Sequence, residues 1–98
     1  MSRAMRVAAV QMVAGGDVAV NLAQAGPLVT DAARAGAALV VLPEYFGILG
    51  ARATDKLAAR ERDGDGRQQA FLAEHARRLG VHVVGGSVPL DTGDPLRV

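Results

Sequence analysis

The sequence predicts an α/β fold in which a β-α-β-α-β order builds a mainly parallel sheet. Short runs rich in valine and leucine cover residues 7–12, 39–42 and 81–84, and each run has the length of a strand. Residues 17–36 and 67–79, between these runs, place apolar residues at steps of three and four, as amphipathic helices do. Strands joined by helical crossovers pair in parallel, and 98 residues provide for one such domain.

The first strand is expected over Val7–Met12, because an apolar run without strict alternation is typical of a parallel strand covered on both faces. A glycine pair then interrupts the run, and Asp17 is a suitable N-cap for a helix that ends near Gly36. Pro27 lies inside this helix and costs about 3 kcal/mol unless the helix kinks or restarts at Gly26.

The second strand, Leu39–Leu42, is expected to end at Pro43, because proline has no N–H to donate to a strand ladder. Residues 45–53 have the composition of a loop, and Thr54 is a suitable cap for a short helix that ends at Arg60. A cluster of aspartates and glycines then predicts a turn.

The second long helix is expected over Arg67–Leu79, with Gly80 as its terminator. Two arginines occupy its last turn, where the helix dipole favours positive charge. Val81–Val84 forms the third expected strand, and Gly85–Ser87 closes it.

Composition excludes several classes of function. Eleven basic and ten acidic side chains leave a net charge of +1 without a basic surface, so we expect no nucleic-acid partner. The N-terminal apolar run is far shorter than the roughly 20 residues of a bilayer span, so we expect no membrane segment and a cytoplasmic protein. Cysteine is absent, which excludes disulfides and thiol chemistry within this chain. His75 and His82 lack the spacing of metal ligands, so we expect no metal.

Several residues that could carry chemistry follow the expected strands. In a doubly wound sheet, reactive groups gather beyond the carboxyl ends of the strands. We therefore expect Gln11 and Met12, Glu44, and Gly85–Ser87 to lie near one edge of the sheet.

Glu44 is the most informative of these side chains. It follows the buried Leu39–Leu42 run and Pro43, so a rigid backbone places it at the edge of an apolar environment. Partial burial would make its carboxylate a better proton acceptor near neutral pH. The alternative is a solvated acid at a strand end or a helix cap.

The segment Leu42–Phe46, set after Val7–Met12 and before Gly85–Ser87, resembles the nitrilase or carbon-nitrogen hydrolase superfamily. The similarity covers nearly the whole chain and includes Asn21 and Leu22 early in the first helix. The resemblance implies an α-β-β-α sandwich and hydrolysis of small non-peptide amides or nitriles by a Glu-Lys-Cys triad, and we expect an amide rather than a nitrile as the substrate. It also implies no cofactor, and a homo-oligomer for the full-length protein.

By this resemblance, Glu44 is the general base that takes the proton of the cysteine thiol. Tyr45 and Phe46 could line the substrate pocket, although aromatics after a buried strand more often pack against the sheet. The chain lacks the cysteine, and we interpret its single lysine, Lys56, as a solvated helix residue. We therefore expect residues 1–98 to be the N-terminal part of such a domain and to be inactive alone.

Two other classes of function stay open. A glycine-rich strand end such as Gly85–Ser87 can hold a nucleotide, but here it runs into Val88–Pro89, and no phosphate-binding motif follows any strand. The chain could instead be a non-catalytic interaction module whose exposed sheet pairs with a partner or with itself.

Overall fold

The computed structural model describes residues 4–98 and contains the predicted α/β arrangement. The strands are β1 (Val7–Ala9), β2 (Leu39–Val41) and β3 (His82–Val84), paired in parallel in the order β1-β2-β3. The helices are α1 (Val18–Arg34), α2 (Ala53–Ala58) and α3 (Arg67–Leu79). The β-α-β-α-β order and the parallel pairing predicted from the sequence are confirmed.

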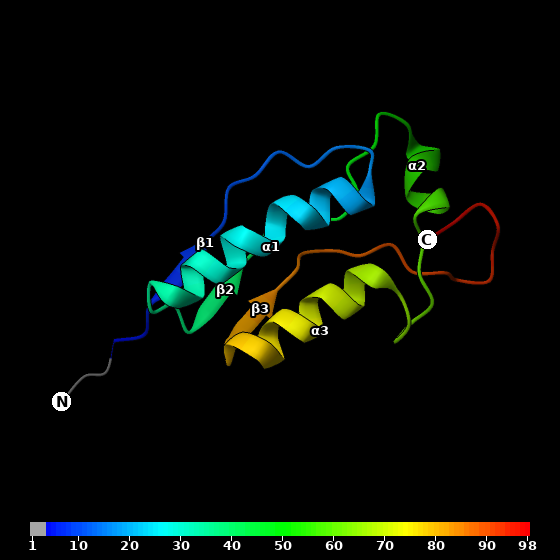
Figure 1. Cartoon of the computed structure of the whole chain (residues 1–98). Coiled ribbons are helices and arrows are strands. Elements are labelled where there is room, and N and C mark those ends of the chain that lie inside the picture. The colour runs from blue at the N-terminus through cyan, green and yellow to red at the C-terminus, as the bar shows by residue number, and fades with distance from the viewer. Residues whose placement is uncertain (1–3) are drawn as a thin grey trace.

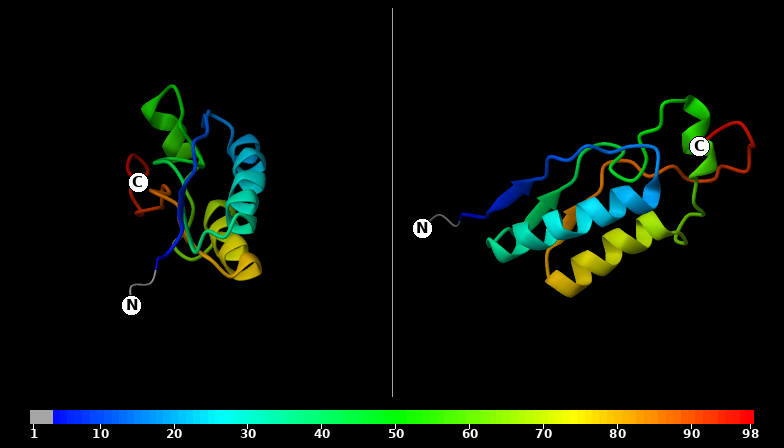
Figure 2. Two further views of the ribbon diagram at one scale, coloured as in Figure 1. Left: turned by 90° about the vertical axis from the view of Figure 1, so that its left-hand side faces the viewer. Right: turned by 45° about the horizontal axis from the view of Figure 1, so that its top comes forward.

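Two layers make up the fold. Helices α1 and α3 lie side by side over one face of the sheet, as Figures 1 and 2 show. Ala8, Val40 and Val83 are paired across the middle of the three strands, are partly or fully buried, and pack into the core. Val7 and Val84, in the flanking registers, are 51% and 47% exposed. Within residues 4–98, therefore, the sheet is well covered on one face only.

Helix α1 runs without a break through Pro27, and Asp17 caps it as predicted: its carboxylate accepts a hydrogen bond from the Val20 N–H at 3.2 Å. The proline is tolerated because both Pro27 and Ala23, whose carbonyl loses its helical donor, are exposed, so water can bond to that carbonyl. The helix ends at Arg34, two residues before Gly36.

Helix α3 has the predicted bounds and ends at Gly80 in the left-handed conformation, with φ of 65°. Helix α2 differs from the expectation. It begins after Arg52, two residues earlier than expected, it ends at Ala58 rather than at Arg60, and Thr54 is not its cap. The Asp55 carboxylate accepts from the Arg52 backbone N–H at 3.0 Å, so an acid inside the first turn supplies the hydrogen bond.

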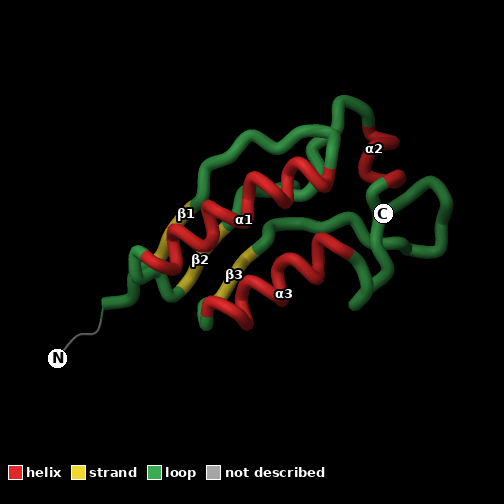
Figure 3. The backbone as a smooth tube through the Cα atoms, viewed as in Figure 1, coloured by secondary structure: helices red, strands yellow, loops and turns green. Residues whose placement is uncertain are grey.

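The core lies between the sheet and the two long helices. Its buried members are small and medium-sized apolar residues with two phenylalanines: Ala25, Val29, Ala37, Val40, Leu42, Phe46 and Phe71. No helix within the described residues is both long enough and apolar enough to cross a membrane. Beyond the strands, the chain continues in long irregular segments, which Figure 3 shows in green. The candidate site lies there.

Candidate functional site at the carboxyl ends of the strands

The segments that follow the three strands converge, as the connectivity predicts. Hydrogen bonds continue past the strands, from the Val10 N–H to the Val41 carbonyl at 2.9 Å and from the Leu42 N–H to the Val84 carbonyl at 2.8 Å. Residues 10–13 and Pro43 line one shared hollow of about 390 Å³. The chain after β1 therefore meets the chain after β2.

Gly86 brings the end of β3 against Glu44. A Cβ atom at Gly86 would lie 3.0 Å from the Glu44 Cα and 3.1 Å from the Pro43 carbonyl oxygen. Gly86 also has φ of 59°, a conformation that glycine adopts at little cost. Close approach and backbone conformation thus both favour glycine here, and Gly86 packs against the backbone of Glu44.

Glu44 itself lies three residues after the end of the central strand β2 and is exposed. The partial burial expected from the sequence is therefore not provided by residues 4–98. The two ion pairs within these residues join Arg60 to Asp91 and Arg97 to Asp94, so neither neutralises Glu44. The carboxylate is held by its backbone and has an open side from which another group can approach.

Tyr45 has a strained backbone, with φ of 55°. A non-glycine residue in this left-handed region costs about 1–2 kcal/mol, which the surrounding contacts must offset. One such contact is with Lys56, whose Nζ lies 3.7 Å from the centre of the Tyr45 ring. This cation–π contact links α2 to the residue after Glu44. Tyr45 also lines a hollow of about 280 Å³ together with Ser87–Leu90, Thr92 and Val98.

Phe46 lies in the core. It has no exposed surface, and its ring centre is 5.9 Å from that of Phe71 on α3. The structure thus places the three predicted site residues in different environments: Glu44 is exposed, Tyr45 faces an open hollow, and Phe46 is enclosed.

In the described part of the chain, residues 4–98, three buried polar residues were not singled out as site residues from the sequence: Asn21, Glu61 and Gln68. The Glu61 carboxylate accepts from the backbone N–H groups of Gln68 at 2.6 Å and Gln69 at 3.1 Å, and so caps α3 from a preceding loop. Asn21 lies three residues after Val18 on the inward face of α1. A polar residue at an inward helical position is the signal that could have identified it.

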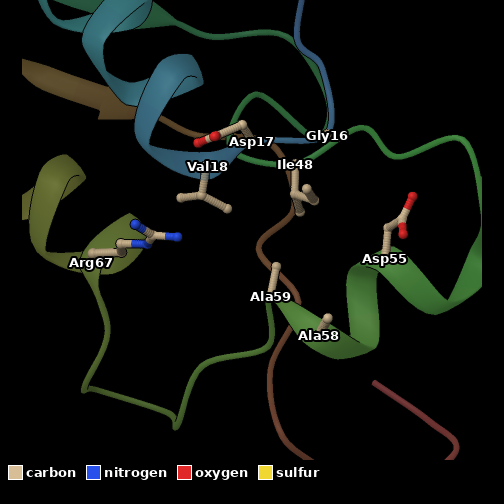
Figure 4. Close-up of a pocket in the computed structure, with 8 residues that line it drawn as sticks. All are labelled: Gly16, Asp17, Val18, Ile48, Asp55, Ala58, Ala59 and Arg67. Carbon is tan, nitrogen blue, oxygen red and sulfur yellow. The ribbon is translucent and has the colours of Figure 1, made fainter.

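A further hollow of about 290 Å³ lies where α1 and α3 begin, beside α2, and Figure 4 shows the residues that line it. Asp17 and Asp55 are among them, and both accept backbone hydrogen bonds at the start of a helix. Arg67 supplies positive charge. These acids therefore have structural roles already, and within residues 4–98 no group of three metal-ligating side chains is found.

Comparison with known proteins identifies the family. The family model for carbon-nitrogen hydrolases matches residues 6–97. This chain belongs to the carbon-nitrogen hydrolase family. The match includes all three strands, both long helices and Glu44.

Two curated relatives are omega-amidases. The chain is 38% identical over 91 residues to omega-amidase NIT2 of Danio rerio, across 93% of this chain and 32% of that protein. It is 34% identical over 79 residues to the chloroplastic omega-amidase of Arabidopsis thaliana, across 78% of this chain and 21% of that protein. The chain thus spans about a third or less of the length of these relatives.

Proposed function

We propose that residues 1–98 contribute the general base, Glu44, to a hydrolase that cleaves small non-peptide amides. The observation that carries the proposal is the position of this acid. It follows the central strand of a parallel sheet, where Gly86 packs against its backbone and its side chain is exposed. The similarity to two omega-amidases favours an amide over a nitrile as the substrate.

In the proposed reaction, the Glu44 carboxylate takes the proton from a cysteine thiol, and the thiolate attacks the amide carbon. A lysine stabilises the negative charge on the resulting tetrahedral intermediate. Glu44 then returns the proton to the leaving nitrogen, ammonia departs, and a thioester stays on the enzyme. Water, deprotonated by Glu44, attacks the thioester and releases the carboxylic acid and the thiol.

The cysteine must come from polypeptide other than residues 1–98, because this chain has none. We propose the same source for the lysine, since Lys56 is already engaged with the Tyr45 ring. The exposed side of Glu44 is the side on which these groups would approach. The homo-oligomer and the cytoplasmic location expected from the sequence stay predictions.

The proposal is tested in the polypeptide that supplies the cysteine and lysine. Glu44→Gln removes the proton acceptor and keeps the shape, so kcat for release of ammonia from a simple ω-amide should fall by about 10²–10⁴-fold. Glu74→Gln, an exposed position on α3, is the matched control and should keep the wild-type rate. Residues 1–98 alone should release no ammonia above background. Turnover by this chain alone, or an active Glu44→Gln variant, would contradict the proposal.

A further inference from the structure

The loop that follows Glu44 is anchored by a buried carboxamide from α1. Asn21 is 1% exposed. Its Nδ2 donates to the carbonyls of Gly15 and Gly47, both at 2.9 Å, and its Oδ1 accepts from the Gly15 N–H at 2.9 Å. The Leu49 N–H donates to the same Gly15 carbonyl at 3.0 Å. One side chain thus joins the segment after β1, helix α1 and the segment after β2.

A second buried carboxamide lies on the other side of Gly47. Gln68 on α3 is 1% exposed, and its Nε2 donates to the Ala59 carbonyl at 3.2 Å. A Cβ atom at Gly47 would lie 2.1 Å from the Gln68 Oε1, so no larger residue fits here without movement. Gly47 is therefore held between the carboxamides of α1 and α3.

The path from this anchor to Glu44 is short and stiff. Only two residues separate them: Phe46, which is fully buried, and Tyr45, which is held at φ of 55°. On its other side, Glu44 follows Leu42, whose N–H is bonded to Val84 of β3. The backbone of Glu44 is thus fixed by the sheet before it and by the Asn21 anchor after it.

We propose that Asn21 is a positioning residue for Glu44, an inference that rests on the function proposed above. An apolar side chain would be enough to fill the core at this helix position, since filling space needs no hydrogen-bond donors. Asn21 instead uses both amide hydrogens and its oxygen on two loops that follow strands. Because reaction rates are sensitive to displacements of about 1 Å, loss of this anchor should lower the rate of the chemical step.

The first test uses residues 1–98 and amide hydrogen exchange. Asn21→Asp keeps the shape but places a carboxylate oxygen beside the Gly15 and Gly47 carbonyls, so the loop should separate from α1. The Leu49 amide should then exchange about tenfold faster or more, beyond any change in global stability. Val29→Ala, at a fully buried position of the same helix, is the control and should change exchange through global stability alone. If exchange of the Leu49 amide in Asn21→Asp changes only as much as global stability does, as in the control, the inference is overturned.

The second test uses the polypeptide that supplies the cysteine and lysine. Asn21→Asp should lower kcat by about 10–100-fold and leave KM within about twofold, because the anchor acts on the base and not on substrate binding. Asn21→Ser introduces no charge and should show the same pattern if Asn21→Asp does not fold. If the Asn21 variants keep the wild-type kcat while Glu44→Gln is inactive, the positioning role of Asn21 is overturned and the proposed function stands. A fully active Glu44→Gln overturns the proposed function, and the exchange experiment still decides whether Asn21 anchors the loop.

Discussion

Replacing Glu61 by alanine should destabilise the protein by about 2–4 kcal/mol. Glu61 is 8% exposed, and its carboxylate accepts from two backbone N–H groups at the start of α3. Loss of a helix cap costs about 0.5–2 kcal/mol, and each buried donor left without a partner costs about 1–3 kcal/mol. The buried-donor cost applies to the Gln68 N–H, and only the ordinary cap cost applies to the part-buried Gln69 N–H, which water can reach, so the sum of about 1.5–5 kcal/mol is centred on about 2–4 kcal/mol.

The backbone contacts of Glu61 indicate that the loss of stability should spread beyond the N-terminus of α3. Its own N–H donates to the Pro89 carbonyl at 2.9 Å, and its carbonyl accepts from the Asp91 N–H at 2.8 Å. The residue therefore joins the loop before α3 to the segment after β3. Loosening it should release the post-β3 segment, which lines the hollow next to Tyr45.

The assay is urea unfolding followed by circular dichroism, with three variants. Glu61→Ala should lower the midpoint most. Glu61→Gln keeps one acceptor oxygen and should lose about half as much stability. Asp63→Ala, an exposed position in the same turn region, should lie within about 0.5 kcal/mol of wild type. A Glu61→Ala variant as stable as Asp63→Ala would refute the capping role derived from the structure.

Three further predictions concern stability and surface. Phe46→Ala should cost about 3–5 kcal/mol in the same unfolding assay, because it empties a fully buried site; a loss under about 1 kcal/mol would contradict the packing found here. Asp55→Ala should remove about 1 kcal/mol of capping energy and so increase amide exchange in α2, whereas Thr54→Ala should leave the exchange unchanged. Faster exchange in Thr54→Ala alone would instead support Thr54 as the N-cap. The thinly covered sheet face should bind a hydrophobic dye such as ANS, and replacing Val7 and Val84 together by threonine should weaken that fluorescence; unchanged fluorescence would place the dye elsewhere.

Features set by local chemistry could be predicted from the sequence. Asp17 caps α1 and Gly80 terminates α3 because short-range hydrogen bonds and backbone conformation decide helix ends. The convergence of Glu44 with Gly86 follows from parallel connectivity alone.

Features that depend on contacts between distant residues could not be predicted in this way. Glu61 caps α3 from a position seven residues before Gln68, and the sequence between them resembles an ordinary turn. Nothing local indicates that Tyr45 adopts positive φ, since glycine or asparagine is the usual choice there. The exposure of Glu44 depends on which elements cover the sheet edge, and strand patterns do not show this.

The central claim, that Glu44 deprotonates a cysteine, is tested most directly by intact-protein mass spectrometry of the polypeptide that supplies that cysteine. After rapid mixing with a simple ω-amide and acid quenching, the wild type should show a covalent adduct whose mass equals the substrate less ammonia. Glu44→Gln should show no adduct on the same timescale at neutral pH, whereas Glu74→Gln should form it as the wild type does. An adduct that forms at the wild-type rate without the Glu44 carboxylate would contradict the claim.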